Sequence, residues 1–394
     1  MTGVADRPAR KVERMRTTKA KALWPAPLSA AIPAPRAPYQ DRYPTLFRRG
    51  HQFEIALGQR LALGGFKGPT DVAFGPDGWL YVMNRYPNDG HLAGVRWVQV
   101  NVKDDGFEFE VVPKDPPGKP GATGHEWLGS LQMTVCDSQG VLYSADEHRH
   151  TVVRCSIRGE TLGYWGHPGD KPGQLNGPTG MCLDADESLW IVNTLNHRVD
   201  HYTREGEWLG GFGQQGTGPG ELNFPWGVAI DPINGTVVVA DWRNDLVKRF
   251  SRDGKLLQVI GRPGHGEGEL HRPAGVAEDN HGDIYVADRG NNRVLSFNYR
   301  GMFIESFIGD AVINDRGMQK VLTNLDMVRM RDNIENLDRE KRLKAPVSVR
   351  VDNKGRVYIA DTGRYRVQVY RKMCKALRPD EVDPPTLHVD PVLT

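Results

Sequence analysis

A sequence unit that recurs about every 47 residues limits the possible folds of this chain more than any other feature. Between residues 178 and 261 the unit occurs twice in succession, each time as four short apolar runs separated by Gly, Asp and Asn. Such runs predict four antiparallel strands joined by tight turns. One four-stranded sheet cannot bury both of its faces alone, so the units are expected to stack against one another.

Six Asp or Asn residues hold equivalent places at the end of each second predicted strand: Asn84, Asp146, Asn193, Asp241, Asp288 and Asp361. Their successive spacings are 62, 47, 48, 47 and 73 residues, so two units contain insertions. Six equivalent positions predict an all-β fold, a six-bladed β-propeller of four-stranded antiparallel blades. The last unit, residues 346–370, supplies three strands, and residues 50–58 resemble the missing fourth. We therefore expect an N-terminal strand to close the ring, which removes exposed sheet edges.

The repeat divides the chain into a basic, Pro-rich N-terminal arm (1–49), the propeller (50–372) and a C-terminal tail (373–394). The arm fits either a disordered tail or a segment anchored to the body or to a partner by its aromatic residues, Trp24, Tyr39, Tyr43 and Phe47. Within the propeller, residues 86–94 and 114–126 are predicted loops. Residues 312–344, between blades five and six, carry apolar side chains at three- and four-residue spacing, which predicts an amphipathic helix or helical pair.

Charge is distributed unevenly along the chain. Residues 1–50 carry eleven Lys and Arg against three acidic residues, whereas the rest carries 40 basic and 46 acidic residues. Because phosphate neutralisation supplies most of the affinity for nucleic acids, the net acidic body disfavours a nucleic-acid partner. The four cysteines have neither metal-ligand nor disulfide spacing. The chain has no secretory signal pattern and no run of 18 apolar residues, so we expect a cytoplasmic protein without a membrane span.

Several units resemble the NHL repeat. The closest matches read Asp-Ile-Tyr-Val-Ala-Asp-Arg-Gly-Asn-Asn-Arg-Val at 283–294 and Val-Tyr-Ile-Ala-Asp-Thr-Gly at 357–363. The resemblance extends over about residues 50–372 and implies a six-bladed β-propeller. It implies little about function, since the family includes RNA-binding modules, protein-interaction modules, receptor sensor domains and lyases.

The residue after each first-strand proline, or its equivalent, is expected to line the mouth of the central channel: Thr70, Gln132, Thr179, Trp226, Ala274 and Val347. Amidating lyases with NHL repeats place zinc-binding histidines at such positions, and this chain has none there. The resemblance therefore gives no lyase-type metal site and no cofactor. Arg85 falls where those lyases carry a substrate-binding arginine.

The loops between second and third strands add cationic and aromatic groups to the predicted mouth. The predicted ligand-binding residues are Arg85, Tyr86, His148, Trp226, Trp242, Arg243 and Arg289. This composition suits a small anionic or aromatic ligand, or an acidic peptide. His148 and His150 would share one face of a strand, so a metal held with a third ligand is a further alternative.

Two functions stay open from the sequence, and no residue is assigned a catalytic role. The first is a rigid platform for a protein or a ligand, a subunit or scaffold of a larger complex, with the arm and residues 312–344 as attachment devices. The second is a metal-assisted lyase or hydrolase with Arg85, His148 and Asp71 near the axis. Gluconolactonase-like propellers hold a divalent ion with axial Glu, Asn and Asp, and Asp71 and Asn193 are the partial counterparts here.

Overall fold

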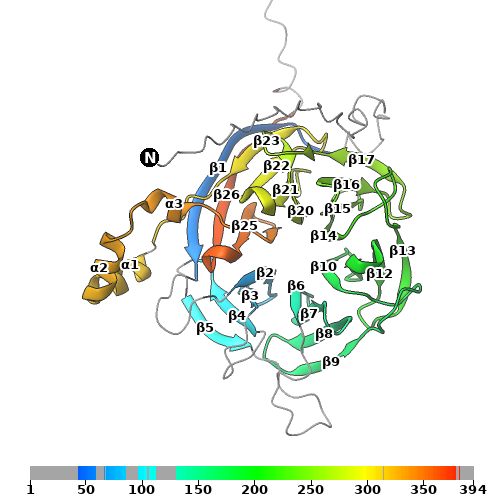
Figure 1. Ribbon diagram of the computed structural model, residues 1–394, viewed down its shortest axis with the longest axis horizontal. Helices are drawn as coiled ribbons and strands as arrows, with labels where there is room; N and C mark the ends of the chain where they lie inside the picture. The colour runs from blue at the N-terminus through cyan, green and yellow to red at the C-terminus, as the bar shows by residue number, and fades with distance from the viewer. Residues whose placement is uncertain are drawn as a thin grey trace, which may run out of the picture. The chain divides into compact units, whose positions relative to one another are not determined.

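The computed structural model describes residues 43–58, 66, 68–85, 96–103, 106–111, 130–313, 315–378 and 381, all within the compact unit Arg36–Thr394. These residues form six four-stranded antiparallel sheets arranged around one axis (Figure 1). The predicted six-bladed β-propeller is confirmed.

The blades follow chain order, and each first strand lies nearest the axis (Figure 1). Blade one contains β2 (Pro69–Phe74), β3 (Leu80–Asn84), β4 (Arg96–Asn101) and β5 (Gly106–Val111). Blade two contains β6 (Leu131–Cys136), β7 (Val141–Asp146), β8 (Thr151–Ser156) and β9 (Thr161–Trp165). Blade three contains β10 (Pro178–Leu183), β11 (Leu189–Asn193), β12 (Arg198–Tyr202) and β13 (Trp208–Phe212).

The second half of the ring has the same organisation. Blade four contains β14 (Pro225–Ile230), β15 (Val237–Asp241), β16 (Leu246–Phe250) and β17 (Leu256–Ile260). Blade five contains β20 (Pro273–Glu278), β21 (Ile284–Asp288), β22 (Arg293–Phe297) and β23 (Phe303–Phe307). Blade six contains β24 (Ser348–Val351), β25 (Arg356–Asp361) and β26 (Arg366–Ala376), and the short pair β18 (Arg262–Pro263) and β19 (Glu269–Leu270) lies between blades four and five in sequence.

An N-terminal strand completes blade six, as the sequence predicts. Strand β1 (Leu46–Leu57) pairs antiparallel with β26, from Leu46 opposite Ala376 to Leu57 opposite Val367. Strand β24 of the same blade also contacts β2 and β20, so the innermost strands form a closed circle. The first and last parts of the propeller are therefore joined at one blade.

Apolar clusters between successive blades hold the ring together. Four of the second strands, including β11 and β15, are buried along their whole length, and β7 and β25 are buried beyond their first residue, because both faces of these strands meet neighbouring sheets. The first strands approach each other closely where the repeat has glycine. A Cβ atom on Gly180 would lie 2.2 Å from the carbonyl oxygen of Trp226, so a larger residue cannot stand there without moving the next blade.

The recurring polar residues brace the connections between blades. On the face where second strands end, here called the upper face, Asp288 accepts a hydrogen bond from the His271 N–H at 2.7 Å. Arg293 donates to Asp288 at 2.8 Å and to the carbonyl oxygens of Gly266 and Glu269 at 2.7 Å. Arg198 and Arg366 likewise donate to a nearby aspartate and to loop carbonyl oxygens, so these three recurring arginines brace the connections between blades.

The insertion between blades five and six forms three short helices outside the ring (Figure 1). They are α1 (Asp315–Thr323), α2 (Leu325–Asp332) and α3 (Leu337–Lys341). Asn324 caps α2 by accepting from the Asp326 N–H at 3.0 Å, and Asn336 caps α3 by accepting from the Arg339 N–H at 3.0 Å. Asparagine is favoured at N-caps, so each of these two residues begins a new helix. The segment therefore contains three helices, where the sequence predicts one helix or a pair.

Of the four aromatic residues considered as anchors of the arm, two lie among the described residues. Tyr43 is 7% exposed and Phe47 is 57% exposed, whereas Trp24 and Tyr39 lie outside the described part of the chain. Within that part, no helix has the length and apolar character needed to cross a membrane.

Candidate functional site

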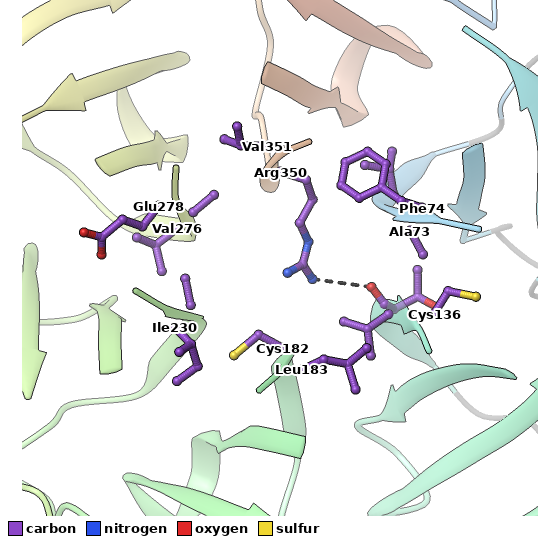
Figure 2. A pocket seen from close by; sticks show the side chains of 15 residues that line it. Ala73, Phe74, Cys136, Cys182, Leu183, Ile230, Val276, Glu278, Arg350 and Val351 are labelled. Atoms are coloured by element: carbon purple, nitrogen blue, oxygen red, sulfur yellow. Dashed lines mark hydrogen bonds between the residues drawn. The ribbon is translucent and has the colours of Figure 1, made fainter. Parts of the chain in front are cut away.

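The centre of the ring is occupied by a side chain that breaks the repeat. Arg350 extends from β24 into the middle of the channel (Figure 2). Its Nη2 lies 2.5 Å from Asp71 Oδ2, and its Nε donates to Asp71 Oδ1 at 2.9 Å. Nη2 also donates to the carbonyl oxygens of Met181 at 3.1 Å and Thr134 at 3.4 Å. One guanidinium group thus connects blade six to blades one, two and three.

The carboxylate of Asp71 is fully engaged at this position. In addition to the two bonds from Arg350, it accepts from the Thr134 N–H at 2.9 Å and from the Ser348 hydroxyl. Four donors fill the acceptor sites of one carboxylate. Asp71 is therefore a structural partner of Arg350, and the interpretation of Asp71 as part of an axial metal or catalytic site is not supported.

Arg350 stays charged in this environment. Burial lowers the pKa of Arg350, but the adjacent Asp71 carboxylate outweighs burial and raises that pKa above its ordinary value. The pair is nearly enclosed, with Asp71 fully buried and the Arg350 side chain 13% exposed. A buried pair of this kind is costly to break, because the remaining charge loses its partner.

Equivalent positions in the repeat show how unusual this pair is. The other blades carry small or apolar residues where Arg350 stands: Ala73, Val135, Cys182, Ala229 and Ala277. Blades three, four and five carry Gly180, Gly227 and Gly275 where Asp71 stands. Both residues are therefore visible in the sequence as departures from the repeat, two and four positions after the first-strand proline.

Below Arg350, towards the opposite or lower face, the ends of the first strands enclose a pocket of about 260 Å³ (Figure 2). Most of the residues that line it are of apolar types, among them Phe74, Leu183, Ile230 and Val351. Glu278 belongs to the lining, but its carboxyl group turns away from the centre of the pocket (Figure 2).

Two thiols also line the pocket. Burial raises the pKa of Cys136 to about 12, and burial likewise raises the pKa of Cys182 to about 12. Both thiols are therefore protonated at neutral pH and are poor nucleophiles. All four cysteines are free.

Three of the predicted ligand-binding residues come together on the upper face. The Trp226 and Trp242 rings lie 5.6 Å apart, and the Arg243 guanidinium lies 4.4 Å from the Phe224 ring centroid and 5.6 Å from that of Trp242. Arg272, which the sequence did not single out, lies 4.4 Å from the Trp242 ring centroid. We call these five residues the aromatic–guanidinium patch: Phe224, Trp226, Trp242, Arg243 and Arg272.

The patch contains two indole N–H groups without an acceptor. Nε1 of Trp226 and Nε1 of Trp242 are both covered by protein atoms, and neither finds a hydrogen-bond partner among the described residues. A covered donor without an acceptor costs about 1–3 kcal/mol. A ligand that displaced the covering atoms and brought its own oxygen atoms would satisfy both donors.

The other predicted residues are separate from this patch. Arg85 pairs with Glu147 at 3.2 Å, His148 is exposed, and Arg289 is exposed at the end of β21. Across the described ranges, no hydrogen bond, ion pair or ring contact joins these three to the patch. Tyr86 lies outside the described residues.

The residues considered for metal binding have structural partners. His150 Nδ1 accepts from the Gly177 N–H at 2.8 Å. Asn193 accepts from the Asn176 N–H at 2.7 Å and donates to Asp200 at 2.7 Å. Within the part of the chain that the structure describes, no group of three or more His, Cys, Asp or Glu residues is arranged to hold a metal ion.

Comparisons with known proteins agree with the fold. Residues 222–250, 270–297 and 343–370 match the NHL repeat, and residues 56–82 match the N-terminal family of strictosidine synthase-like proteins. None of the curated protein sequences compared with the chain matches it significantly.

Solved structures share the architecture at low sequence identity. A gluconolactonase from Xanthomonas campestris is 14% identical with a TM-score of 0.52, covering 84% of this chain and 98% of its own. A protein of unknown function from Bacteroides thetaiotaomicron is 16% identical with a TM-score of 0.53, covering 83% and 77%. A virginiamycin B lyase from Staphylococcus aureus is 10% identical with a TM-score of 0.48, covering 80% and 87%. At these identities the likeness concerns the fold alone.

Proposed function

Because this chain carries NHL repeats in a six-bladed β-propeller, we propose that it is a rigid platform that binds a protein partner, as a subunit or scaffold of a larger complex. The observation that carries the proposal is the helical insertion α1–α3, whose large apolar side chains face solvent. Leu325 is 73% exposed and Met330 is 71% exposed, and further exposed apolar residues of the segment are Leu322, Ile334 and Leu337.

These helices are too short to be stable by themselves. They contain nine, eight and five residues, whereas isolated helices shorter than about 12 residues are marginal in water. Neither α2 nor α3 has a buried residue, and among the described residues of α1 Gly317 and Val321 are buried. Covering one exposed Leu or Met contributes about 2 kcal/mol, so an apolar surface of a partner would stabilise the segment.

The test is a comparison of two double variants of the full chain, isolated from its source organism. We expect the wild-type chain to elute as a complex of defined mass, with slowed hydrogen exchange in residues 315–341. Leu325→Ser with Met330→Ser should give the free chain. The control, Leu162→Ser with Tyr164→Ser, changes two exposed residues of β9 and should leave the complex intact. A complex that survives the helix variant unchanged contradicts the proposal.

The aromatic–guanidinium patch favours a second candidate function, the binding of an acidic peptide or another anionic ligand. Arg243 and Arg272 supply positive charge, and the two indole N–H groups of Trp226 and Trp242 supply donors without acceptors. Carboxylate oxygens match both features.

A titration with hexaglutamate tests this candidate. We expect the indole N–H resonances of Trp226 and Trp242 to shift, and Arg243→Ala to weaken binding about tenfold. Arg289→Ala, which removes an exposed arginine of the same face, should change binding less. An unchanged indole spectrum at saturating peptide would remove this candidate.

The enzyme alternative, a metal-assisted lyase or hydrolase, has less support. Asp71 is paired with Arg350, His150 accepts from a backbone N–H, and the thiols of the pocket have raised pKa values. The gluconolactonase and the lyase among the similar structures share the fold at 14% and 10% identity.

A further inference from the structure

Each first-strand hairpin on the lower face contains an aspartate, and five of the six aspartates are bonded in the same way. The partner is an aromatic side chain at the second position of the second strand, or its equivalent, in the same blade. The pairs are Tyr81 to Asp77 at 2.6 Å, Tyr143 to Asp137 at 3.1 Å, Trp190 to Asp184 at 3.0 Å, Tyr285 to Asp279 at 3.2 Å and Tyr358 to Asp352 at 2.9 Å. The arrangement is a regular feature of the repeat.

Blade four departs from this pattern. Val238 stands where the other blades carry Tyr or Trp, so Asp231 has no aromatic donor from its own strand. The missing hydroxyl comes from the N-terminal segment. Tyr43 donates to Asp231 Oδ2, and its oxygen lies 3.5 Å from Glu278 Oε1.

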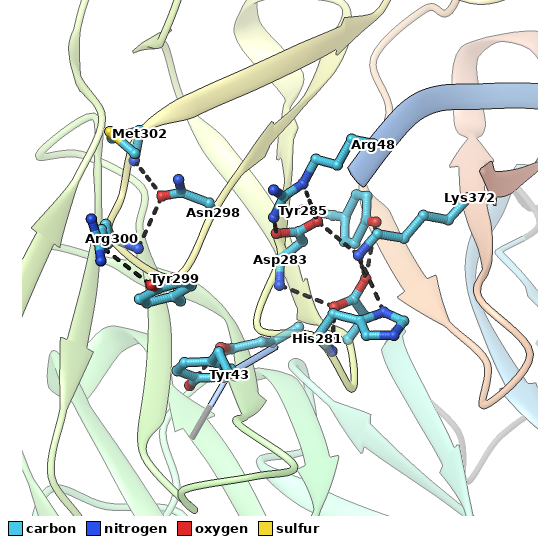
Figure 3. Close-up of polar contacts among 12 residues, drawn as sticks. Tyr43, Arg48, His281, Asp283, Tyr285, Asn298, Tyr299, Arg300, Met302 and Lys372 are labelled. Atoms are coloured by element: carbon cyan, nitrogen blue, oxygen red, sulfur yellow. Dashed lines mark hydrogen bonds and ion pairs between the residues drawn. The ribbon is translucent and has the colours of Figure 1, made fainter. Parts of the chain in front are cut away.

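The surrounding residues form a fitted notch for the Tyr43 ring. Tyr299 stacks on it with ring centroids 4.7 Å apart and planes at 22°, and Figure 3 shows the two rings face to face. Gly282, with φ of +79°, also borders the ring, since an added Cβ would lie 2.4 Å from it. A larger residue at 282 would occupy the space of the ring. We call Asp231, Arg249, Glu278, Gly282 and Tyr299 the phenol notch.

The charges in the notch favour a neutral ligand. The buried Arg249 donates from Nη1 to Asp231 at 3.1 Å and from Nη2 to Glu278 at 2.8 Å. Burial raises the pKa of Glu278 to about 8, with Arg249 opposing the shift and Asp231 adding to it. Glu278 therefore holds its proton more readily than an ordinary glutamate does, and the Arg249 guanidinium offsets the carboxyl groups around it. An uncharged phenol fits this balance, whereas a phosphorylated tyrosine would bring two further negative charges beside Asp231.

The contacts of Tyr43 with other described residues are made by its side chain. It precedes the first residue of β1 by three positions, and among the described residues its backbone forms no hydrogen bond. The next attachments of the segment are Thr45, whose carbonyl accepts from the Leu377 N–H at 2.8 Å, and Arg48, which pairs with Asp283 at 2.5 Å (Figure 3). The tyrosine can therefore leave the notch while most of β1 stays paired with β26, and its departure loosens only the first residues of that strand.

We propose that the phenol notch is a binding site for an uncharged phenol group and that Tyr43 is its exchangeable occupant. A tyrosine side chain presented by a partner protein takes the same place, stacks on Tyr299 and donates to Asp231. The segment that precedes β1 is then released from the ring. Occupancy of this one site decides whether the N-terminal arm is attached at Tyr43.

The first test uses the full chain with Tyr43→Ala and the probe p-cresol, which is the side chain of tyrosine with a hydrogen in place of the Cα. We expect p-cresol to raise the melting temperature of this variant in a saturable manner, and toluene and p-cresyl phosphate to have a much smaller effect. The matched control is Tyr164→Ala, which removes an exposed tyrosine of β9 and should respond much less, because Tyr43 still competes for the notch. An equal response to toluene would mean an apolar cavity rather than a phenol site and would overturn the proposal.

The second test uses the wild-type chain and needs no destabilised variant. With ring-labelled tyrosine, the Tyr43 signal is assigned by its loss in Tyr43→Phe. We expect millimolar p-cresol to move this signal to the position of an exposed tyrosine, while the signals of the other tyrosines stay in place. A Tyr43 signal that does not move when p-cresol is added up to its solubility would show that the occupant is not exchangeable.

Discussion

Arg350 of β24 forms a bidentate ion pair with Asp71 of β2, and this pair lies at the same junction that β1 closes from outside. The junction between blades six and one is where the two ends of the propeller sequence meet. At its outer edge, β1 supplies the fourth strand through main-chain hydrogen bonds. At its inner edge, two charged residues replace the small residues of the repeat. The ring is therefore secured at both edges of one junction.

The first prediction concerns this inner closure. Arg350→Ala should lower the free energy of unfolding by about 3 kcal/mol, because it leaves the Asp71 carboxylate buried without its counter-ion. Arg350→Ala combined with Asp71→Gly restores the small residues that the repeat has elsewhere, and it should recover at least half of that loss. Denaturant unfolding measures both values, which form a double-mutant cycle with Asp71→Gly alone. Purely additive losses would show that the two side chains act independently.

The regular part of the molecule could be predicted from the sequence because it depends on local patterns. The alternation of apolar residues predicts the strands, and the Gly, Asp and Asn positions predict the turns between them. Each of these patterns depends on neighbours within one unit, and the six copies of the unit predict six blades. The bracing arginines were predictable for the same reason, since Arg293 bonds to an aspartate five residues away.

The remaining features depend on contacts that local patterns do not contain. Arg350 and Asp71 are 279 residues apart, and Tyr43 and Asp231 are 188 residues apart. Each pair is nevertheless visible in the sequence as a departure from the repeat. Arg350 and Asp71 stand where other blades have small residues, and Val238 stands where other blades have Tyr or Trp. Arg272 belongs to the patch because it contacts Trp242, 30 residues earlier in the chain. An arginine at this position does not by itself predict that contact.

The second prediction concerns the pH dependence of folding. The pKa of Glu278 is about 8 in the folded chain against an ordinary value of 4.5, so the folded state holds its proton more tightly than the unfolded state. Stability should therefore fall as pH rises from about 4.5 to 8 and should show no further loss from this group above pH 8. Glu278→Gln keeps the acceptor for Arg249 and removes the titration.

Unfolding of the two proteins between pH 5 and pH 9 measures the effect. The wild-type chain should lose on the order of 2–4 kcal/mol relative to Glu278→Gln across this range. The other titrating groups are common to both proteins, so they cancel in the difference. A constant difference at all pH values would contradict a raised pKa at Glu278.

The third prediction separates a bracing arginine from an exposed one in the same blade. Arg293→Ala removes the bonds to Asp288 and to the carbonyl oxygens of Gly266 and Glu269, so it should cost about 2 kcal/mol. Hydrogen exchange should accelerate in residues 264–270. Arg289→Ala should change stability by less than about 0.5 kcal/mol, because its side chain is exposed. Equal effects of the two substitutions would contradict the bracing role.

The last prediction separates two roles of Tyr43, its contribution to the stability of the ring and its attachment of the N-terminal arm. Tyr43→Ala should cost about 3 kcal/mol, because it removes a buried aromatic ring and leaves Asp231 without its hydroxyl donor. Adding Val238→Tyr should recover much of this stability. Blade two shows that the substitution fits, since Tyr143 lies opposite Arg154 and donates to Asp137, just as position 238 lies opposite Arg249 beside Asp231.

The arm should behave differently from the ring in this double variant. The introduced side chain satisfies Asp231 from within blade four, so it restores stability without attaching the N-terminal segment. Hydrogen exchange at the first residues of β1 should stay as fast as in Tyr43→Ala, and p-cresol should no longer raise the melting temperature. Restored protection of β1 in the double variant would mean that Tyr43 does not anchor the arm, because the ring alone would then determine the order of that strand.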